Sequence, residues 1–235
     1  MHLSSERWLG IVGGTSWEST ALYYRLLNET VRTQQGGLHS ARLLLASVDF
    51  APLEANMRTG NWTAVEACLL QAGKRLVAAG AGALLLASNT LHRLYPILST
   101  ALPVPMLHIA DAAGAALSRD GHRKVLLLGT QYTMEAPFYR ERLAEAWGLT
   151  ALIPSPAERQ ALQRLIFDDL CQGRVPPEGT RLLQALTGQE GIDAVLLGCT
   201  ELTLALPGHA AACPVYDTAR LHAEAGAAWL LEDCA

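Results

Sequence analysis

The sequence predicts an α/β protein built from two similar lobes, each a doubly wound parallel sheet, related by an approximate two-fold axis. Short apolar runs alternate with amphipathic helical segments along almost all of its 235 residues, as is typical of parallel strands joined by right-handed helical crossovers. The sequence also repeats itself. Gly14–Arg25 (GTSWESTALYYR) aligns without gaps with Gly129–Arg140 (GTQYTMEAPFYR), and Ala83–Leu91 aligns with Ala194–Leu202. A duplicated half-domain explains both alignments.

The repeat makes Ser88 and Cys199 equivalent positions. Ser88 lies 74 residues after Gly14, and Cys199 lies 70 residues after Gly129. Each follows an apolar run and precedes polar residues, so each is expected at the carboxyl end of a strand. We expect the chemistry where the two halves differ, at this serine and this cysteine.

Eight apolar runs fit buried parallel strands covered on both faces. They are residues 8–13, 42–48, 83–87, 104–109, 124–129, 151–154, 194–198 and 213–216. Helical spacing of apolar residues recurs between them, as in Tyr23, Leu26, Leu27 and Val31, and in Val65, Cys68, Leu69, Ala72 and Leu76. Thr15 and Glu18 have capping-box spacing and are predicted to open the first helix.

The repeat also sets the expected domain limits. Residues 1–112 are predicted as the first lobe and 113–216 as the second, with a crossover near Asp111 to Gly121. Residues 217–235 are expected to form a C-terminal helix that packs back on the first lobe.

Composition narrows the class of protein. Half of the residues are hydrophobic and 17% are charged, a compact globular composition, and the net charge of −4 argues against a nucleic-acid-binding or polybasic membrane surface. No apolar run reaches the roughly 18 residues of a membrane-spanning helix. The five cysteines have no C-x-x-C spacing, so we expect reduced thiols in the cytoplasm. The histidines lack the spacing of metal ligands, and no metal is expected.

Four loops follow predicted strands with polar residues: Gly13-Gly14-Thr15-Ser16, Ser88-Asn89-Thr90, Gly129-Thr130-Gln131 and Gly198-Cys199-Thr200-Glu201. Ligands of open α/β sheets bind beyond the carboxyl ends of the strands. If the lobes face each other, all four loops converge on one cleft. Their backbone N–H groups and hydroxyls suit a carboxylate, and no nucleotide-binding glycine pattern is present.

The roles of individual residues remain open at this point. Cys199 is either a small buried hydrophobe or a reactive thiol, and its equivalence to Ser88 favours reactivity. Ser88 is at least a helix cap. His92 either tunes the site or caps a carbonyl. Glu201 is a general base, a partner that orients Cys199, or an acidic residue in the first turn of a helix, and we favour the second role.

At these residues the chain resembles the aspartate/glutamate racemases, the amino-acid racemases that work without pyridoxal phosphate. The opening GIVGGTSWESTALYYRLLNE is similar to that family's glycine-rich first loop and helix. SNTLH resembles its first active-site motif, C-N-T-x-H, and GCTEL matches its second motif, G-C-T-E. Ser88 in place of the first cysteine is similar to the subgroup selective for L-aspartate and L-glutamate.

The resemblance implies a cofactor-independent racemase with a two-base mechanism. Cys199 would remove the α-proton of the L-isomer, and Ser88 would supply a proton on the opposite face. Thr15, Ser16, Asn89, Thr90, Thr130, Thr200 and Glu201 would bind the amino acid, with His92 behind them. We expect nearby dipoles to convert the Cys199 thiol to a thiolate. The resemblance also implies a homodimer.

Two departures concern the substrate side chain. The family's acidic-substrate members hold that carboxylate with a lysine where this chain has Gln160-Ala161, and with an arginine that has no match in SVDFAPLEANM. The arginines that could substitute are Arg25, Arg42, Arg58, Arg159 and Arg164.

Three functions follow from these motifs. The first is racemisation of L-aspartate, L-glutamate or a related amino acid. The second is a single-thiol reaction of the same superfamily, such as decarboxylation of a substituted malonate or an isomerisation. The third is a catalytically weak amino-acid-binding protein.

Overall fold

The computed structural model describes residues 7–206, 211 and 213–232, which fold as two compact units. Unit 1 comprises the chain up to His108 together with the residues from His222 onward, and unit 2 comprises Ile109–Leu221. Each unit contains one four-stranded parallel sheet, called sheet A in unit 1 and sheet B in unit 2. The predicted α/β class is confirmed.

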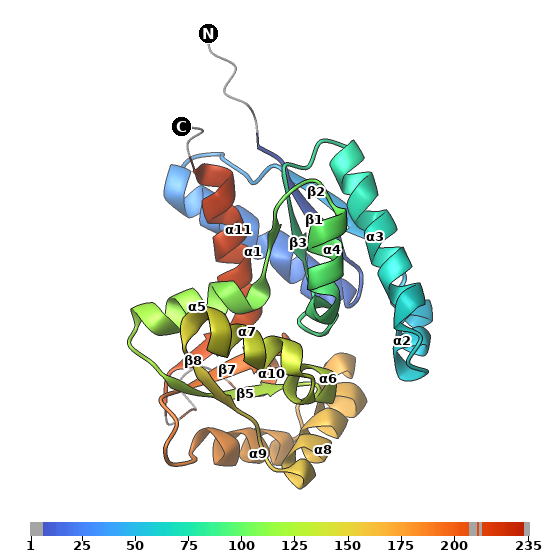
Figure 1. The fold of residues 1–235 in the computed structure, drawn as a ribbon. Coiled ribbons are helices and arrows are strands. Elements are labelled where there is room, and N and C mark those ends of the chain that lie inside the picture. Colours follow the sequence, from blue (N-terminus) through green and yellow to red (C-terminus); the bar gives the residue numbers. More distant parts are fainter. Residues whose placement is uncertain (1–6, 207–210, 212, 233–235) are drawn as a thin grey trace. The chain divides into compact units, whose positions relative to one another are not determined.

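Sheet A has the strand order β2-β1-β3-β4. Its unit contains β1 (Leu9–Gly13), α1 (Trp17–Gln35), β2 (Leu43–Ser47), α2 (Phe50–Arg58), α3 (Trp62–Ala78), β3 (Ala83–Leu86), the 3₁₀ helix η1 (Thr90–Leu94), α4 (Tyr95–Ala101), β4 (Met106–Leu107) and most of α11 (Thr218–Leu231). Figure 1 shows α1 and α11 on one face of this sheet and α3 and α4 on the other. This is the doubly wound arrangement.

Sheet B has the order β6-β5-β7-β8. Its unit contains α5 (Ile109–Arg119), β5 (Lys124–Gly129), α6 (Gln131–Glu135), α7 (Pro137–Trp147), β6 (Thr150–Leu152), α8 (Pro156–Arg164), the π-helical turn η2 (Leu165–Asp169), the 3₁₀ turn η3 (Leu170–Gln172), α9 (Pro177–Thr187), β7 (Ala194–Gly198), α10 (Leu202–Ala205) and β8 (Val215–Asp217). In Figure 1, α5 and α7 lie on one side of this sheet and α9 on the other. The central strands β5 and β7 are buried along almost their whole length.

The two sheets repeat one topology, but the first half of the sequence alignment is wrong by one residue. Leu9 pairs with Ala83 in sheet A, and Val125 pairs with Ala194 in sheet B. With Ala83 equivalent to Ala194, Leu9 is equivalent to Val125, and hence Gly13 to Gly129. The slip arises because Gly14 and Thr15 separate β1 from the cap of α1, whereas the cap of α6 follows β5 directly.

Six of the eight predicted strands are shorter than expected, and a proline lies near one end of three of them. The run 104–109 pairs only at Met106 and Leu107, because Pro105 has no N–H to donate to the ladder and offers only its carbonyl, to the Leu84 N–H. Pro214 acts likewise before β8, where its carbonyl accepts from the Val195 N–H. Pro154 follows β6.

The predicted capping box at Thr15 is also wrong. Ser16 is the N-cap of α1, and its hydroxyl accepts a hydrogen bond from the Ser19 N–H at 3.1 Å. Glu18 accepts from the Ser16 hydroxyl instead of closing a box with Thr15. A complete capping box opens α8, between Ser155 and Glu158.

The helices that follow the last strand of each sheet are exchanged between the units. Helix α5 follows β4 of sheet A and belongs to unit 2, whereas α11 follows β8 of sheet B and from His222 onward belongs to unit 1. Gly226 allows α11 to lie close to sheet A, because a Cβ atom there would lie 2.9 Å from Leu85 Cδ1 and 3.0 Å from Leu9 Cδ2.

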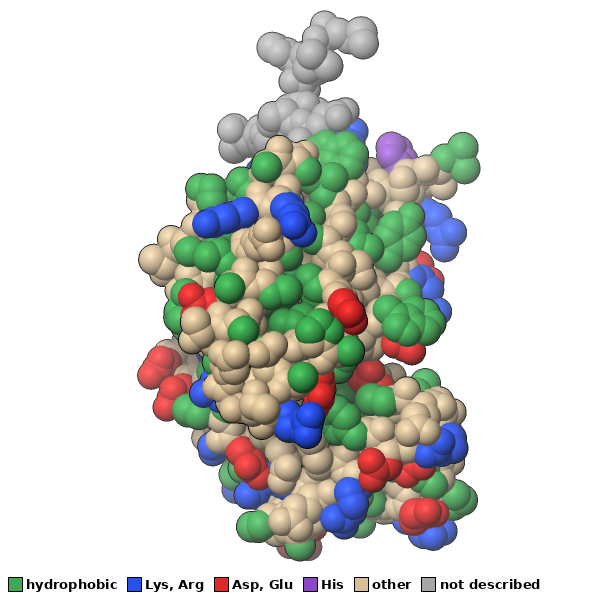
Figure 2. All heavy atoms as spheres, turned by 90° about the vertical axis from the view of Figure 1, so that its right-hand side faces the viewer, with side chains coloured by type: hydrophobic (Ala, Val, Ile, Leu, Met, Phe, Trp, Pro, Cys, Tyr) green, Lys and Arg blue, Asp and Glu red, His purple; other side chains and the backbone are tan. Residues whose placement is uncertain are grey.

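The surface carries both signs of charge. On the face drawn in Figure 2, basic and acidic side chains are interspersed with apolar ones, in keeping with the small net charge of −4. Among the helices of the described residues, none has the length and hydropathy needed to cross a bilayer.

Candidate active site

In unit 1, two loops leave the neighbouring strands β1 and β3 at their carboxyl ends. Gly14 turns the first loop with φ +91°, and a side chain there would place Cβ 2.1 Å from the Val48 carbonyl oxygen. The Gly14 N–H donates to the Thr20 hydroxyl at 2.8 Å. Thr15 is buried next to it, and Ser16 caps α1. The Val48 backbone and the Thr20 hydroxyl, which both contact Gly14, therefore fix the conformation of this loop.

Ser88 lies at the head of the second loop. The Ala87 N–H still pairs with the Val12 carbonyl of β1, and the Ser88 N–H donates to the Leu86 carbonyl at 2.8 Å, which turns the chain away from the sheet. The Ser88 hydroxyl accepts from the Leu91 N–H at 3.4 Å, which makes it a weak cap of η1. Asn89, which is buried, is at the N-cap position of η1, and Thr90, which is partly exposed, is its first residue.

His92 holds the backbone of this loop. Its Nδ1 lies 2.7 Å from the Ser88 carbonyl oxygen, and the side chain is buried. Because a carbonyl only accepts, Nδ1 carries a proton. Burial, followed by the neighbouring His108 and His222, lowers the pKa of His92 well below its usual range. His92 is thus neutral and caps a carbonyl, which was one of its two predicted roles.

In unit 2, Thr130 and Cys199 directly follow Gly129 and Gly198, which are paired in neighbouring strands. Thr130 is the N-cap of α6, and its hydroxyl accepts from the Thr133 N–H at 3.3 Å. The absence of side chains at the two glycines permits this approach, because a Cβ on Gly129 would lie 3.0 Å from the Gly198 oxygen.

Cys199 is paired with an acid. Its Sγ donates to Oε2 of Glu201 at 3.0 Å, and the Thr200 hydroxyl donates to the same oxygen at 2.8 Å. All three side chains are partly buried. Glu201 therefore lies where the predicted orienting partner of Cys199 should lie.

The protonation of Cys199 differs from the sequence-based expectation. Burial raises the pKa of this thiol well above its usual range, and the Glu201 carboxylate raises it further. The expected stabilisation of a thiolate by local dipoles does not occur in this state, because the nearest partner is an anion. The group is a thiol whose proton is already directed at a carboxylate.

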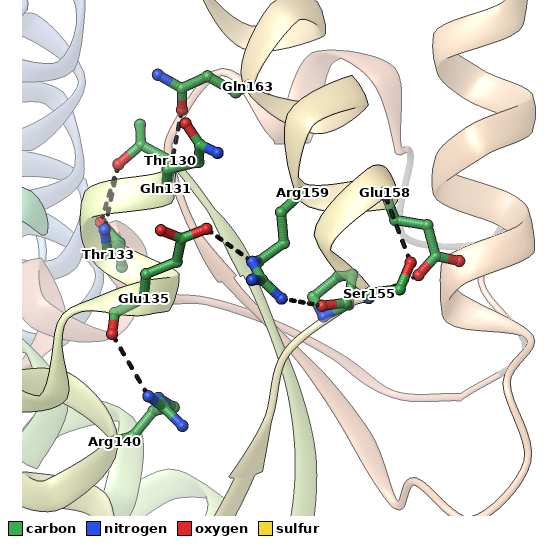
Figure 3. A network of polar contacts seen from close by, with 10 residues as sticks. Thr130, Gln131, Thr133, Glu135, Arg140, Ser155, Glu158, Arg159 and Gln163 are labelled. Atoms are coloured by element: carbon green, nitrogen blue, oxygen red, sulfur yellow. Dashed lines mark hydrogen bonds and ion pairs between the residues drawn. The ribbon is translucent and has the colours of Figure 1, made fainter.

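A polar network surrounds the loop Gly129-Thr130-Gln131, which follows β5 in unit 2 and is called the β5 loop (Figure 3). The Gln131 N–H donates to Gln163 Oε1 at 2.9 Å. Arg159, which is largely buried, pairs with Glu135 at 2.8 Å and donates to the Pro154 carbonyl at 2.6 Å. Arg159 was one of five arginines considered for the substrate side chain, and here a carboxylate of the protein already neutralises it.

Two more of those arginines are also in ion pairs, Arg25 with Glu29 and Arg58 with Glu54, both on exposed helix faces. Such exposed pairs contribute little to stability. Neither belongs to the loops described above.

Asp217 was missed by sequence reasoning. It ends β8, the neighbour of β7, and its Oδ1 accepts from the Ala219 N–H at 2.9 Å. Burial raises the pKa of this carboxyl group. The sequence VYDTAR held the signal, because an aspartate before a helical segment is a preferred N-cap.

The remaining cysteines of the described part of the chain lie on different elements. Cys68 is partly buried on α3 and Cys171 is exposed. His209 and Cys234 lie outside the described residues. No group of three or more His, Cys, Asp or Glu in the described ranges is arranged to hold a metal ion.

The chain matches known proteins over nearly its whole length. Residues 12–226 match the model of the Asp/Glu/hydantoin racemase family. A structure from Yersinia pestis, described as a candidate Asp/Glu racemase, is 38% identical, with 96% of this chain and 100% of that chain covered and a TM-score of 0.91. An aspartate racemase homologue from Pyrococcus horikoshii is 34% identical, with coverage of 97% and 100% and a TM-score of 0.83.

A more distant structure supports the fold alone. The aspartate racemase of Picrophilus torridus is 19% identical, with 96% of this chain and 93% of that chain covered and a TM-score of 0.72. Racemases are isomerases, and this chain belongs, as an isomerase, to the Asp/Glu/hydantoin racemase family.

Proposed function

We propose that the protein racemises an amino acid without a cofactor, with Cys199 acting on one face of the α-carbon and Ser88 on the other. The observation that carries the proposal is the pairing of the Cys199 thiol with Glu201, 3.0 Å away, at the carboxyl end of β7. A thiol with an adjacent carboxylate has both a proton to give and a group that can accept it.

The proposed sequence of proton transfers begins with Glu201. As the substrate binds, Glu201 takes the thiol proton, and the resulting thiolate of Cys199 removes the α-proton of the L-isomer. The planar carbanion then receives a proton from Ser88 on the opposite face. In the reverse direction, deprotonated Ser88 removes the α-proton of the D-isomer, and Cys199 as a thiol gives its proton to the carbanion on the other face. Partial burial makes the thiolate, once Glu201 has taken the thiol proton, a stronger base towards the α-proton, because a desolvated thiolate is a stronger base.

The α-carboxylate is proposed to bind at the loops rather than at a charged side chain. The hydroxyls and N–H groups of Thr15, Ser16, Asn89, Thr90, Thr130 and Thr200 are the proposed donors. Donors of this kind stabilise the carboxylate most when charge develops on it during deprotonation.

L-Aspartate and L-glutamate are the first substrates proposed. The resemblance of Ser88-Asn89-Thr90 to the subgroup selective for these L-isomers supports them. Arg159 belongs to the polar network around the loop after β5, and a substrate side-chain carboxylate would compete there with Glu135. The test therefore includes neutral analogues such as L-asparagine and L-glutamine.

A single-thiol reaction is the second candidate, and one observation favours it. The Ser88 hydroxyl is engaged as a cap of η1, while Cys199 is held in its protonated form, which suits a one-sided proton donor. Decarboxylation of a substituted malonate needs only that donor.

Incubation of a panel of L- and D-amino acids in D₂O, analysed by chiral chromatography and mass spectrometry, separates the candidates. Racemisation yields both enantiomers with solvent deuterium at the α-carbon, a malonate decarboxylase releases CO₂, and a binding protein does neither. Cys199→Ala should abolish turnover of the L-isomer with the fold intact. Cys68→Ala, a partly buried thiol on α3, is the matched control.

A further inference from the structure

Five aromatic rings meet inside unit 1 behind the Ser88 loop: Tyr23, His92, Tyr95, His108 and His222. We call them the ring cluster. Ring centroids of His92 lie 4.8 Å from His108 and 5.5 Å from His222, and those of Tyr95 and His108 lie 4.4 Å apart. The members come from α1, η1, α4, the residue after β4, and α11.

Hydrogen bonds fix the orientation of His222. The Tyr23 hydroxyl lies 2.9 Å from its Nδ1, and the Leu107 carbonyl oxygen lies 2.9 Å from its Nε2. Because the carbonyl only accepts, Nε2 carries a proton, so in the neutral ring Nδ1 is the acceptor for the tyrosine hydroxyl. No more than 1% of the surface of Tyr23 or of His222 is exposed.

His92 connects this bonded pair to Ser88. Its ring packs edge-on against His222, and its Nδ1 donates to the Ser88 carbonyl at 2.7 Å. The Leu107 carbonyl, which accepts from His222, also lies against His92. Tyr23, His222, His92 and the Ser88 carbonyl therefore form a continuous series of contacts.

Stability alone does not require a polar cluster at this place. Burying hydroxyl and imidazole groups costs free energy that hydrogen bonds only offset, and apolar side chains of similar size would fill the same space. What a bonded network adds is a single orientation of each ring. Here the oriented ring of His92 hydrogen-bonds the backbone carbonyl of Ser88.

We infer that Tyr23 and His222 are positioning residues for Ser88, acting through His92. The inference rests on the proposed role of Ser88 as proton donor on one face of the α-carbon. A shift of the Ser88 turn displaces its hydroxyl, and displacements of about 1 Å cost reactions up to about 100-fold. Cys199 belongs to the other unit and has no member of the ring cluster among its described partners.

The test compares two reactions of the same protein. Racemisation uses both faces of the α-carbon, whereas exchange of the α-proton of the recovered L-isomer in D₂O uses the Cys199 face alone. We expect Tyr23→Phe, which removes one oxygen atom, to slow racemisation about 10-fold or more and to leave exchange within about twofold of wild type. The substrate is the L-amino acid turned over fastest in the panel.

Tyr139→Phe is the matched control. Tyr139 is the buried tyrosine of unit 2, and its hydroxyl makes no hydrogen bond to the part of the chain that is described. Removing that oxygen should change neither reaction.

His222 supplies a second variant pair. His222→Gln keeps an N–H that can reach the Leu107 carbonyl and should retain more racemisation than His222→Ala, at equal exchange rates. Circular dichroism and thermal melting identify any variant that does not fold, and the other pair then decides.

A parallel loss of racemisation and exchange, or no loss of either, would overturn the inference and leave the ring cluster as ordinary core. A wild-type protein that neither racemises nor exchanges any amino acid of the panel would instead overturn the proposed function.

Discussion

The Sγ atom of Cys199 donates to Oε2 of Glu201 across 3.0 Å, so this thiol of unit 2 rests in its protonated form. Thr200 fixes the carboxylate by donating to the same oxygen at 2.8 Å. Burial and the carboxylate together raise the pKa of the thiol well above its usual range. At rest the thiol is thus a proton donor, and in the proposed mechanism it becomes a base only when Glu201 takes that proton.

Replacing Glu201 should change acidity and rate in opposite directions. In Glu201→Gln the anion beside the thiol is gone, so the pKa of Cys199 should fall, although burial still keeps it above the ordinary value. Turnover should nevertheless fall about 10²- to 10⁴-fold, because the group that accepts the thiol proton is lost. The pH dependence of iodoacetamide labelling measures the pKa, and chiral chromatography measures turnover.

Glu178→Gln is the control for that substitution, since it removes the same charge from an exposed position of unit 2. If Glu201→Gln made the thiol more acidic and the enzyme faster, Glu201 would be a brake on Cys199 and not its proton acceptor.

His92 should make the stability of the protein fall in acid. Its pKa is depressed well below 6.5 in the folded protein, mainly by burial, while the unfolded chain binds a proton near pH 6.5. The unfolded state therefore binds more protons below that pH. Stability is fully present above about pH 6.5 and is lost as the pH falls towards the folded pKa, by up to about 1.4 kcal/mol per pH unit.

Urea unfolding between pH 7 and pH 5 measures this slope. His92→Asn, whose amide can still donate to the Ser88 carbonyl, should flatten it. His39→Gln changes an exposed histidine and should leave it as in wild type. An equal slope in the wild type and in His92→Asn would assign the acid sensitivity to other groups.

Gly14 should be the least replaceable of the glycines at positive φ. In Gly14→Ala the residue would keep φ +91° and place Cβ 2.1 Å and 2.4 Å from the Val48 backbone. Gly60 has φ +75° but open space around the position of a Cβ. Gly60→Ala should cost about 1 kcal/mol of unfolding free energy, and Gly14→Ala at least about 2 kcal/mol more, because backbone atoms must move.

Chemical denaturation of both variants gives the comparison. Equal losses would mean that the β1 loop relaxes freely around Val48, and the proposed carboxylate donors Thr15 and Ser16 would then not be held by the fold.

The parts of the fold that depend on short segments could be predicted from the sequence. Continuous apolar runs located the central strands β1, β3, β5 and β7, because a strand buried on both faces must be apolar throughout. The equivalence of Ser88 and Cys199 followed from the alignment of Ala83–Leu91 with Ala194–Leu202. The alignment of Gly14–Arg25 with Gly129–Arg140 is displaced by one residue. The loop after β1 is longer than the loop after β5, and the motifs on either side do not reveal the difference.

The parts that depend on packing between distant segments could not be predicted. Tyr23, His92 and His222 are far apart in the chain, and each alone has the pattern of an ordinary core or capping residue. The acidity of Cys199 was predicted in the wrong direction because the sequence does not show that the thiol is buried beside the Glu201 carboxylate, and both burial and that charge raise its pKa.

Ser88 is the residue on which racemisation and a one-sided reaction differ. An alcohol is far less acidic than a thiol, so in Ser88→Cys the opposite face gains a better proton donor and acceptor, and the rates of both directions should rise about 10-fold or more. The enantiomers have equal free energy in water, so kcat/KM must stay equal for the two directions, and the gain must appear in both.

Ser88→Ala should reduce inversion strongly while the α-proton of the L-isomer still exchanges through Cys199. Ser155→Ala, which removes a capping hydroxyl from α8, controls for the loss of a cap. Should Ser88→Ala and Ser88→Cys both match the wild type in chiral assays, the hydroxyl would serve only the Leu91 N–H, and the single-thiol reaction would become the better account of this site.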